Sequence, residues 1–296
     1  MSLDGVAWAV VALFGAAAIA HRRRPRFARG AAVAGWVGFA GFWAALLPVF
    51  ARQVHSPVET GGAAIAVGAC LLVAWRVATR GPPVLYRLTT GVAVAGTVYL
   101  AAGTLDPVRS LLVETVAAHT HAVTTGLGYD AVLGENPATG DRAMLTFVTD
   151  GHQYRTVLVF ACTGIGAIAV FTGVVAAVDA PRHRKASALV GVTALLWGLN
   201  LARNAFIAVA FGRQWLQIGV PQVLSVTGYR DPGLVSYVVA DRLIAQPLSV
   251  VAIIGVAAVT ARALPELYPT TRRLVAAIGG DRPSPSASPA HGGTDR

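Results

Sequence analysis

Residues 3–20 read LDGVAWAVVALFGAAAIA, and residues 21–30 continue as HRRRPRFARG. A helix rises about 1.5 Å per residue, so about 20 apolar residues cross the hydrocarbon of a bilayer, and the first run predicts a membrane-spanning helix. No basic residue precedes this run, whereas five arginines follow it. This order is not that of a cleavable signal peptide. It predicts that the N-terminus lies outside and that the arginines stay in the cytoplasm.

The composition of the whole chain also indicates a membrane protein. Of its 296 residues, 55% are hydrophobic and 13% are charged, whereas an average soluble domain carries about 25% charged residues. The mean hydropathy is +0.60. These values exclude a disordered chain and an ordinary cytosolic enzyme. Cys70 and Cys162 are the two cysteines, too few for a disulfide framework.

Apolar runs of this length recur along the chain. They predict seven spans: Leu3–Ala20, Gly30–Phe50, Thr60–Ala78, Leu88–Leu105, Thr156–Val178, Ala186–Phe211 and Leu234–Arg262. With the N-terminus outside, the cytoplasmic segments carry a net charge of +12 and the outer ones −2, which agrees with the positive-inside bias and places the C-terminus in the cytoplasm. The predicted fold class is an all-α polytopic membrane protein of about seven transmembrane helices. Since topology accounts for the basic residues, no nucleic-acid partner is expected.

The chain divides into four expected parts. Residues 1–105 hold four N-terminal transmembrane helices, and residues 106–155 form an extracellular insert. Residues 156–264 form a core of three helices, and residues 265–296 form a cytoplasmic tail that is expected to be disordered, because it ends in a stretch rich in proline and serine.

The extracellular insert has two halves of different character. Val108–Gly126 has the apolar spacing of an amphipathic helix, which is expected to lie on the outer face of the membrane. Tyr129–Leu133 and Ala143–Val148 are β-prone runs around a turn-rich segment, and they predict a small β-hairpin.

Polar residues inside membrane spans are costly and are therefore candidates for function. Arg203 and Arg242 each lie about 13 Å below the outer end of their helix, and Cys162 about 12 Å below it, at 1.5 Å per residue. One thiol and two guanidinium groups are thus expected to share a layer in the outer half of the membrane.

This combination suits nucleophilic catalysis by a thiolate. One arginine stabilises the thiolate and another donates to the oxyanion of a carbonyl under attack, whereas arginine cannot serve as a general base. Four supporting residues are candidates: Asn200 and Asn204 beside Arg203, Thr163 beside Cys162, and His152 as a proton relay. Water is an alternative relay, so the general base stays open.

Other interpretations of the same residues have to be weighed. A cysteine in an apolar helix is usually a packing residue, and this is the preferred interpretation of Cys70. Arg203 and Arg242 could instead form structural ion pairs, with Asp241 as one partner, or bind the substrate of an anion transporter. A structural factor in an envelope complex is a third alternative.

No metal site or cofactor is expected. His119 and His121 are two residues apart and do not share a helix face.

The three polar sites resemble those of the exosortase/archaeosortase family. The resemblance rests on Ala161-Cys162-Thr163-Gly164-Ile165, on Asn200-Leu201-Ala202-Arg203-Asn204 and on Arg242 in the next span. Each motif is short, but their order and common depth are specific, and the resemblance covers most of the chain. The last position is histidine in many members, so an arginine there points to the archaeosortase branch and leaves the general base open.

The resemblance implies a membrane cysteine protease or transpeptidase that is analogous to sortases in chemistry but not in fold. Carried over by position, Cys162 is the nucleophile, and Arg203 and Arg242 are the other catalytic residues. The implied substrates are secreted proteins, such as S-layer glycoprotein, with a C-terminal signal made of Pro-Gly-Phe, a hydrophobic helix and a basic cluster. A membrane lipid is the implied acceptor of the new C-terminus.

Overall fold

The computed structural model describes residues 3–54 and 57–279. The N-terminal half consists of α1 (Leu3–Ala20), α2 (Pro25–Val49), α3 (Pro57–Thr79), α4 (Pro83–Thr104) and α5 (Asp106–Gly126), followed by strands β1 (Val132–Gly134), β2 (Met144–Thr149) and β3 (His152–Val157). The C-terminal half consists of α6 (Ile165–Ala177), α7 (Arg182–Gly212), α8 (Val220–Thr227), α9 (Val235–Val238), α10 (Gln246–Ala263) and α11 (Leu267–Gly279).

Within the described residues, six helical segments are long and apolar enough to cross a membrane. They are Leu3–Ala20, Pro25–Arg52, Glu59–Thr79, Pro83–Thr104, Arg182–Gly212 and Pro232–Ala263. The molecule is therefore an all-α polytopic fold with a small sheet, and six of the expected spans are present.

The fifth expected span, Thr156–Val178, differs from the structure. Thr156 and Val157 end strand β3, and the apolar helix begins only at Ile165. At about 1.5 Å per residue, the 13 residues of α6 extend for about 20 Å, less than the hydrocarbon thickness of about 30 Å. Hydropathy cannot separate an apolar strand from an apolar helix, which is why the sequence predicted one long span here.

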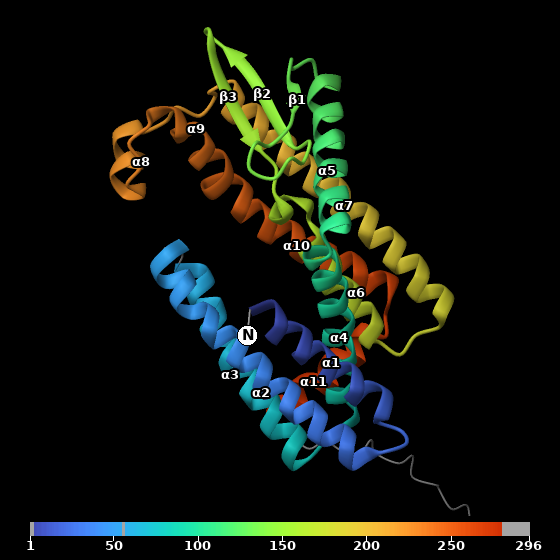
Figure 1. Cartoon of the computed structure of the whole chain (residues 1–296). Coiled ribbons are helices and arrows are strands. Elements are labelled where there is room, and N and C mark those ends of the chain that lie inside the picture. Colours follow the sequence, from blue (N-terminus) through green and yellow to red (C-terminus); the bar gives the residue numbers. More distant parts are fainter. Residues whose placement is uncertain (1–2, 55–56, 280–296) are drawn as a thin grey trace, which may run out of the picture.

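The α1–α2 and α3–α4 connections lie at the end of the molecule away from the sheet (Figure 1). Arg29 beside the first connection donates to the carbonyl oxygen of Val77 at the end of α3, at 3.0 Å. Arg87 at the start of α4 pairs with Asp179 after α6, at 2.8 Å. The first contact joins the start of α2 to the end of α3, and the second joins the start of α4 to the end of α6.

Close glycine contacts hold α6 against α4. A Cβ atom on Gly91 would lie 2.7 Å from the carbonyl oxygen of Gly173, and one on Gly173 would lie 2.4 Å from that of Gly91. Only glycine allows this approach, which is a recurrent way of packing helices in membranes. The contact fixes the position of α6, and hence of the Cys162 turn before it, relative to the N-terminal helices.

The segment between α5 and α6 packs more closely against the rest of the protein than the sequence predicted. β1 pairs with β2 as expected for the two β-prone runs, with Val132 opposite Thr146, but β3 adds a third antiparallel strand. The apolar face of α5, with Val113 and Val116, packs against β2 and α7. The sequence had suggested that the apolar face of this helix lies on the membrane. In the structure this face is covered by protein.

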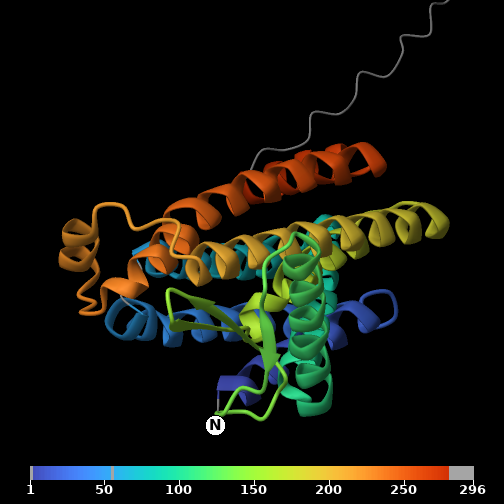
Figure 2. The ribbon, with the colours of Figure 1, turned by 90° about the horizontal axis from the view of Figure 1, so that it is seen from above.

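Seen from above, α7 lies between α10 on one side and α5 with the sheet on the other (Figure 2). Phe147 of β2 is fully buried against Gly212, where an added Cβ atom would lie 2.4 Å from its ring. The sheet is thereby anchored to the end of α7, and α7 connects the insert to α10.

The expected disordered tail is partly helical. Leu267–Gly279 form α11, whose Leu274, Ala277 and Ile278 pack against the buried cluster of α1 to α4. The amphipathic spacing of these residues was the signal that the sequence analysis missed. Residues 280–296 lie outside the described residues.

Candidate active site

Cys162 lies on a tight turn and not within a helix. After β3, the residues Phe160–Thr163 form a single 3-10 turn, in which the amide of Cys162 donates to the carbonyl oxygen of Val159 at 2.8 Å. Gly164 then takes a left-handed conformation with φ of +73°, and α6 begins at Ile165. The depth predicted for Cys162 was based on a continuous helix from Tyr154 onward. That assumption was wrong, because strand β3 and a turn precede α6.

Two asparagine side chains hold the Cys162 turn from α7. The side-chain amides of Asn200 and Asn204 both donate to the carbonyl oxygen of Cys162, each at 2.8 Å. The two asparagines are one helical turn apart and therefore share a face. Because Asn204 is buried, its bond is shielded from water and fixes the turn firmly.

The two residues after Cys162, Thr163 and Gly164, are constrained by the conformation of the turn. A Cβ atom on Gly164 would lie 3.0 Å from Cγ of Asn200, so a side chain there would displace the asparagine. The hydroxyl of Thr163 is buried and donates to the carbonyl oxygen of Phe160 at 2.7 Å. Thr163 thus closes the turn and is not directed at a substrate.

Arg203 is held by an acidic residue of the last span. Its Nη2 lies 2.5 Å from Oδ1 of Asp241, and both side chains are mostly buried, at 27% and 14% exposure. The ion pair that the sequence allowed as an alternative is therefore present. Arg203 shares α7 with Asn200 and Asn204, so the pair is built next to the Cys162 turn.

Arg242 lies on an irregular part of the last span. Val239–Ala245 form a π-helical segment between α9 and α10, a form that is frequent at functional sites. The guanidinium of Arg242 is exposed and donates to the Tyr229 hydroxyl at 3.4 Å. Unlike Arg203, it makes no ion pair with a carboxylate within the described residues and is free to contact a substrate carbonyl or oxyanion.

Direct contacts link the three main predicted residues. Asn200 and Asn204 bind the Cys162 turn from α7, which also carries Arg203, and Asp241, the partner of Arg203, directly precedes Arg242. The three residues therefore lie in one region, although they come from a turn, a helix and a π-helical segment. Tyr229, which contacts Arg242 from the loop before the last span, was missed by the sequence analysis because a loop tyrosine gives no distinctive signal.

His152 is not part of this region. It pairs with Thr149 at the hairpin end of β3 and is exposed, whereas the Cys162 turn follows the other end of the strand. Six strand residues extend for about 20 Å, so the imidazole cannot contact the thiol directly.

The remaining cysteine and histidines have structural neighbours. Cys70 is 4% exposed in the packing of α2 and α3. Nδ1 of His119 accepts from the Trp197 indole at 3.3 Å, and His121 contacts the carbonyl oxygen of Ala131. Across the described parts of the chain, no group of three His, Cys, Asp or Glu residues is arranged to hold a metal ion.

Comparison with known proteins decides the family. Residues 3–224 match the family described as transmembrane exosortase. The chain belongs to this family. With six long apolar helices among its described residues, the protein is a multi-pass membrane protein.

Two curated relatives are similar to this protein over almost the whole chain. Archaeosortase A of Haloferax volcanii is 35% identical over 291 residues, 94% of each chain. Archaeosortase A of Natronomonas pharaonis is 38% identical over 283 residues, 94% of this chain and 90% of the relative. No solved structure matches.

Proposed function

We propose that this protein is a membrane cysteine transpeptidase. It removes a C-terminal signal of Pro-Gly-Phe, hydrophobic helix and basic cluster from secreted surface proteins such as S-layer glycoprotein, and couples the new C-terminus to a membrane lipid. Family membership and the similarity to two archaeosortases A support the reaction class. The observation that carries the proposal is the pair of bonds from Asn200 and Asn204 to the Cys162 carbonyl, which tie the thiol-bearing turn to the helix of Arg203.

In the first step, the Cys162 sulfur bonds to the scissile carbonyl carbon of the substrate and the carbonyl electrons move to oxygen. Arg242 donates to this oxyanion, because it is the exposed guanidinium of the site. The carbon–nitrogen bond then breaks, and the leaving amine takes the proton that the thiol gave up.

In the second step, a hydroxyl or amine of a lipid headgroup attacks the thioester. Its carbon–oxygen or carbon–nitrogen bond forms as the carbon–sulfur bond breaks, and its proton returns to the Cys162 sulfur. Covalent catalysis of this kind divides one difficult step into two easier ones.

Arg203 has a different role from Arg242. Its ion pair with Asp241 holds it beside Asn200 and Asn204 of α7. We therefore assign it to stabilising the thiolate form of Cys162.

The proposed location is the cell membrane, with the N-terminus outside, the C-terminus in the cytoplasm and the site facing the outer leaflet. Support comes from the basic α1–α2 and α3–α4 connections at the end of the molecule away from the sheet (Figure 1). A substrate helix with a cytoplasmic basic cluster would then present its Pro-Gly-Phe segment at the outer leaflet, beside Cys162.

The test is processing of a secreted reporter with such a signal in cells that lack the native enzyme. Wild type and Cys70→Ala are expected to process it and add a lipid mass, whereas Cys162→Ala at equal membrane expression leaves it intact. Processing by Cys162→Ala would overturn the proposal, and cleavage without added mass would overturn its transfer step.

A further inference from the structure

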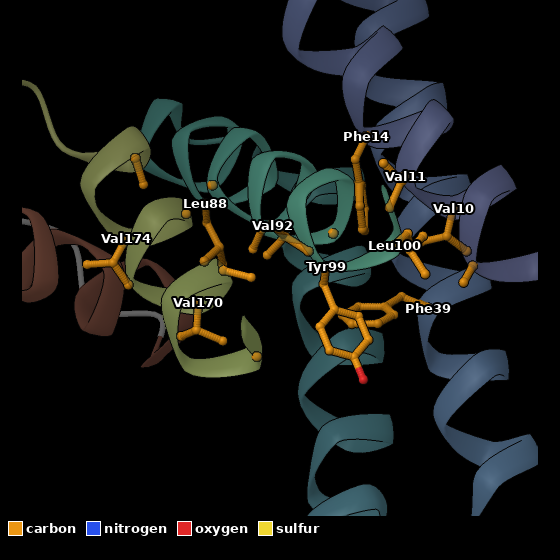
Figure 3. A pocket seen from close by; sticks show the side chains of 18 of the residues that line it. Val10, Val11, Phe14, Phe39, Leu88, Val92, Tyr99, Leu100, Val170 and Val174 are labelled. Carbon is orange, nitrogen blue, oxygen red and sulfur yellow. The ribbon is translucent and has the colours of Figure 1, made fainter. Parts of the chain in front are cut away.

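A deep apolar groove lies below the Cys162 turn. Its volume is about 820 Å³, and it is lined by α1, α2, α4, α6 and α11. Figure 3 shows Phe39 of α2 and Val170 of α6 on opposite sides, with Val92 and Tyr99 of α4 between them. Val170 and Tyr99 are 58% and 45% exposed, so the groove is accessible from outside the chain.

The lining of this groove is almost entirely hydrocarbon. Polar side-chain atoms come from Trp43, Tyr99, Thr270 and Thr271, and every other lining side chain is aliphatic or phenyl, or the residue is glycine. The α2 side carries an aromatic cluster in which the Phe39 and Trp43 rings lie 5.8 Å apart. A surface of this kind binds apolar ligands and offers nothing to a free anion or sugar.

One end of the groove reaches the active site. The Tyr99 ring lies 5.6 Å from that of Phe160, which precedes Cys162 by two residues. Gly166, also in the lining, follows Cys162 by four residues. A ligand in the groove therefore ends beside the catalytic turn.

The other end is closed by α11. Leu267, Thr270 and Leu274 of this helix belong to the lining, near Ala177 at the end of α6. From Gly166 to Ala177 the groove extends for about 16 Å. A complete transmembrane helix is longer than this and would have to continue past α11. The short length of the groove and its end at α11 therefore fit hydrocarbon chains better than a substrate helix.

We propose that this groove binds the hydrocarbon chains of the acceptor lipid and so holds its headgroup at the Cys162 turn. This inference rests on the proposed function for the identity of the lipid as acceptor. Binding of the chains itself is independent of catalysis, which allows the two to be tested separately.

The test uses the full chain in phosphatidylcholine vesicles that contain a small fraction of phosphatidylglycerol with a photoactivatable group on one chain. After irradiation, digestion and mass spectrometry, crosslinks are expected to concentrate on groove residues of α2, α4 and α6. Crosslinks of equal density on the exposed apolar face of α10, where Val251 is 65% exposed, would mean ordinary surface lipid and overturn the proposal.

A matched pair of variants sharpens this test. Val170→Trp fills the groove, and Val190→Trp makes the same change at a 70% exposed position of α7 that is not in the lining. Groove crosslinking should fall about tenfold in Val170→Trp, the change expected when the burial of about two CH₂ groups is lost. It should stay unchanged in Val190→Trp, and equal crosslinking in both would contradict the proposal.

Measurements of reporter processing distinguish the lipid-binding proposal from the proposed function. Val170→Trp should still release the signal from a reporter, but a smaller share of the processed reporter should carry a lipid. Groove crosslinking without any processing by wild type would contradict the proposed function alone. Displacement of the lipid by a signal peptide that itself crosslinks to the groove would show a substrate-helix site and overturn the lipid proposal.

Discussion

The side-chain amide of Asn204 on α7 donates to the backbone carbonyl oxygen of Cys162 at 2.8 Å, across 42 positions of the sequence. Asn200 makes the same bond from one helical turn away. The nucleophile of the proposed reaction is thus positioned through its backbone, while its side chain stays available for chemistry.

Asn204→Asp tests this positioning with a side chain of the same shape that cannot donate. We expect processing to fall by about fivefold or more, because one net hydrogen bond contributes about 1 kcal/mol and a carboxylate would also repel the carbonyl oxygen. The measurement is the rate of reporter cleavage at equal expression. Asn136→Asp in the insert, on an exposed turn, is the control that should process normally. Cleavage by Asn204→Asp at the wild-type rate would contradict a positioning role of Asn204.

Variants of the ion pair between Arg203 and Asp241 can distinguish a structural role of Arg203 from a catalytic one. Asp241→Asn should lower the free energy of unfolding by about 1.5–3 kcal/mol, the contribution of a hydrogen bond between charged groups. The exchanged variant Arg203→Asp/Asp241→Arg should regain part of that stability but no activity, if Arg203 acts on the reaction. Thermal unfolding in detergent and reporter processing give the two readouts. Recovery of activity in the exchanged variant would reduce Arg203 to a structural residue.

Gly164 is a second sensitive point of the turn. Gly164→Ala adds a Cβ atom 3.0 Å from Asn200 at a φ of +73°, so it should strain the backbone by about 1–2 kcal/mol and also displace the asparagine. Gly128→Ala has the same kind of backbone strain at a φ of +85°, with no atom within 4 Å of the added Cβ. Both should lose stability, but only Gly164→Ala should lose cleavage. Equal activity in the two variants would contradict the fit between the turn and Asn200.

Asp141 links the stability of the insert to pH. Hydrogen bonds from the side chains of Ser110 and Thr139, together with the positive charge of Arg109, lower the pKa of its carboxyl. A lowered pKa in the folded state means that the stabilisation is present above the unfolded value, near 3.8, and is lost as the pH falls through the folded value. Protease resistance of the insert should therefore decline below about pH 4 in wild type. Asp141→Asn should show lower resistance at pH 7 and a flatter acid profile, and an identical profile would contradict this role.

Most spans were predictable because the bilayer imposes their composition. Leu3–Ala20 was predicted with the bounds that α1 has, and the expected Ala186–Phe211 lies within Arg182–Gly212. Around Cys162 the prediction failed, because the residues from Val157 to Ala161 are apolar in strand and turn as they would be in a helix. Membrane burial selects for hydropathy and not for secondary structure, so the start of α6 was not visible.

The candidate site was predictable as residue types but not as a network. Cys162, Arg203 and Asn204 stood out as polar residues in apolar surroundings, and the structure brings them together. Both asparagines can donate to the Cys162 carbonyl because the 3-10 turn and the left-handed Gly164 direct this carbonyl towards α7. The conformation of the turn depends on tertiary packing, so the sequence alone did not predict these bonds. The supporting role suggested for His152 failed because β3 carries it away from the turn.

The most direct test of the central claim is to trap the thioester on Cys162. Purified full-length protein in vesicles is incubated with a signal-bearing substrate and hydroxylamine, and the new C-terminus is analysed by mass spectrometry. We predict a hydroxamate at the cleavage site with wild type and with Cys70→Ala, and none with Cys162→Ala. A hydroxamate formed by Cys162→Ala, or signal release by wild type with a free carboxylate and no hydroxamate, would contradict a Cys162 thioester.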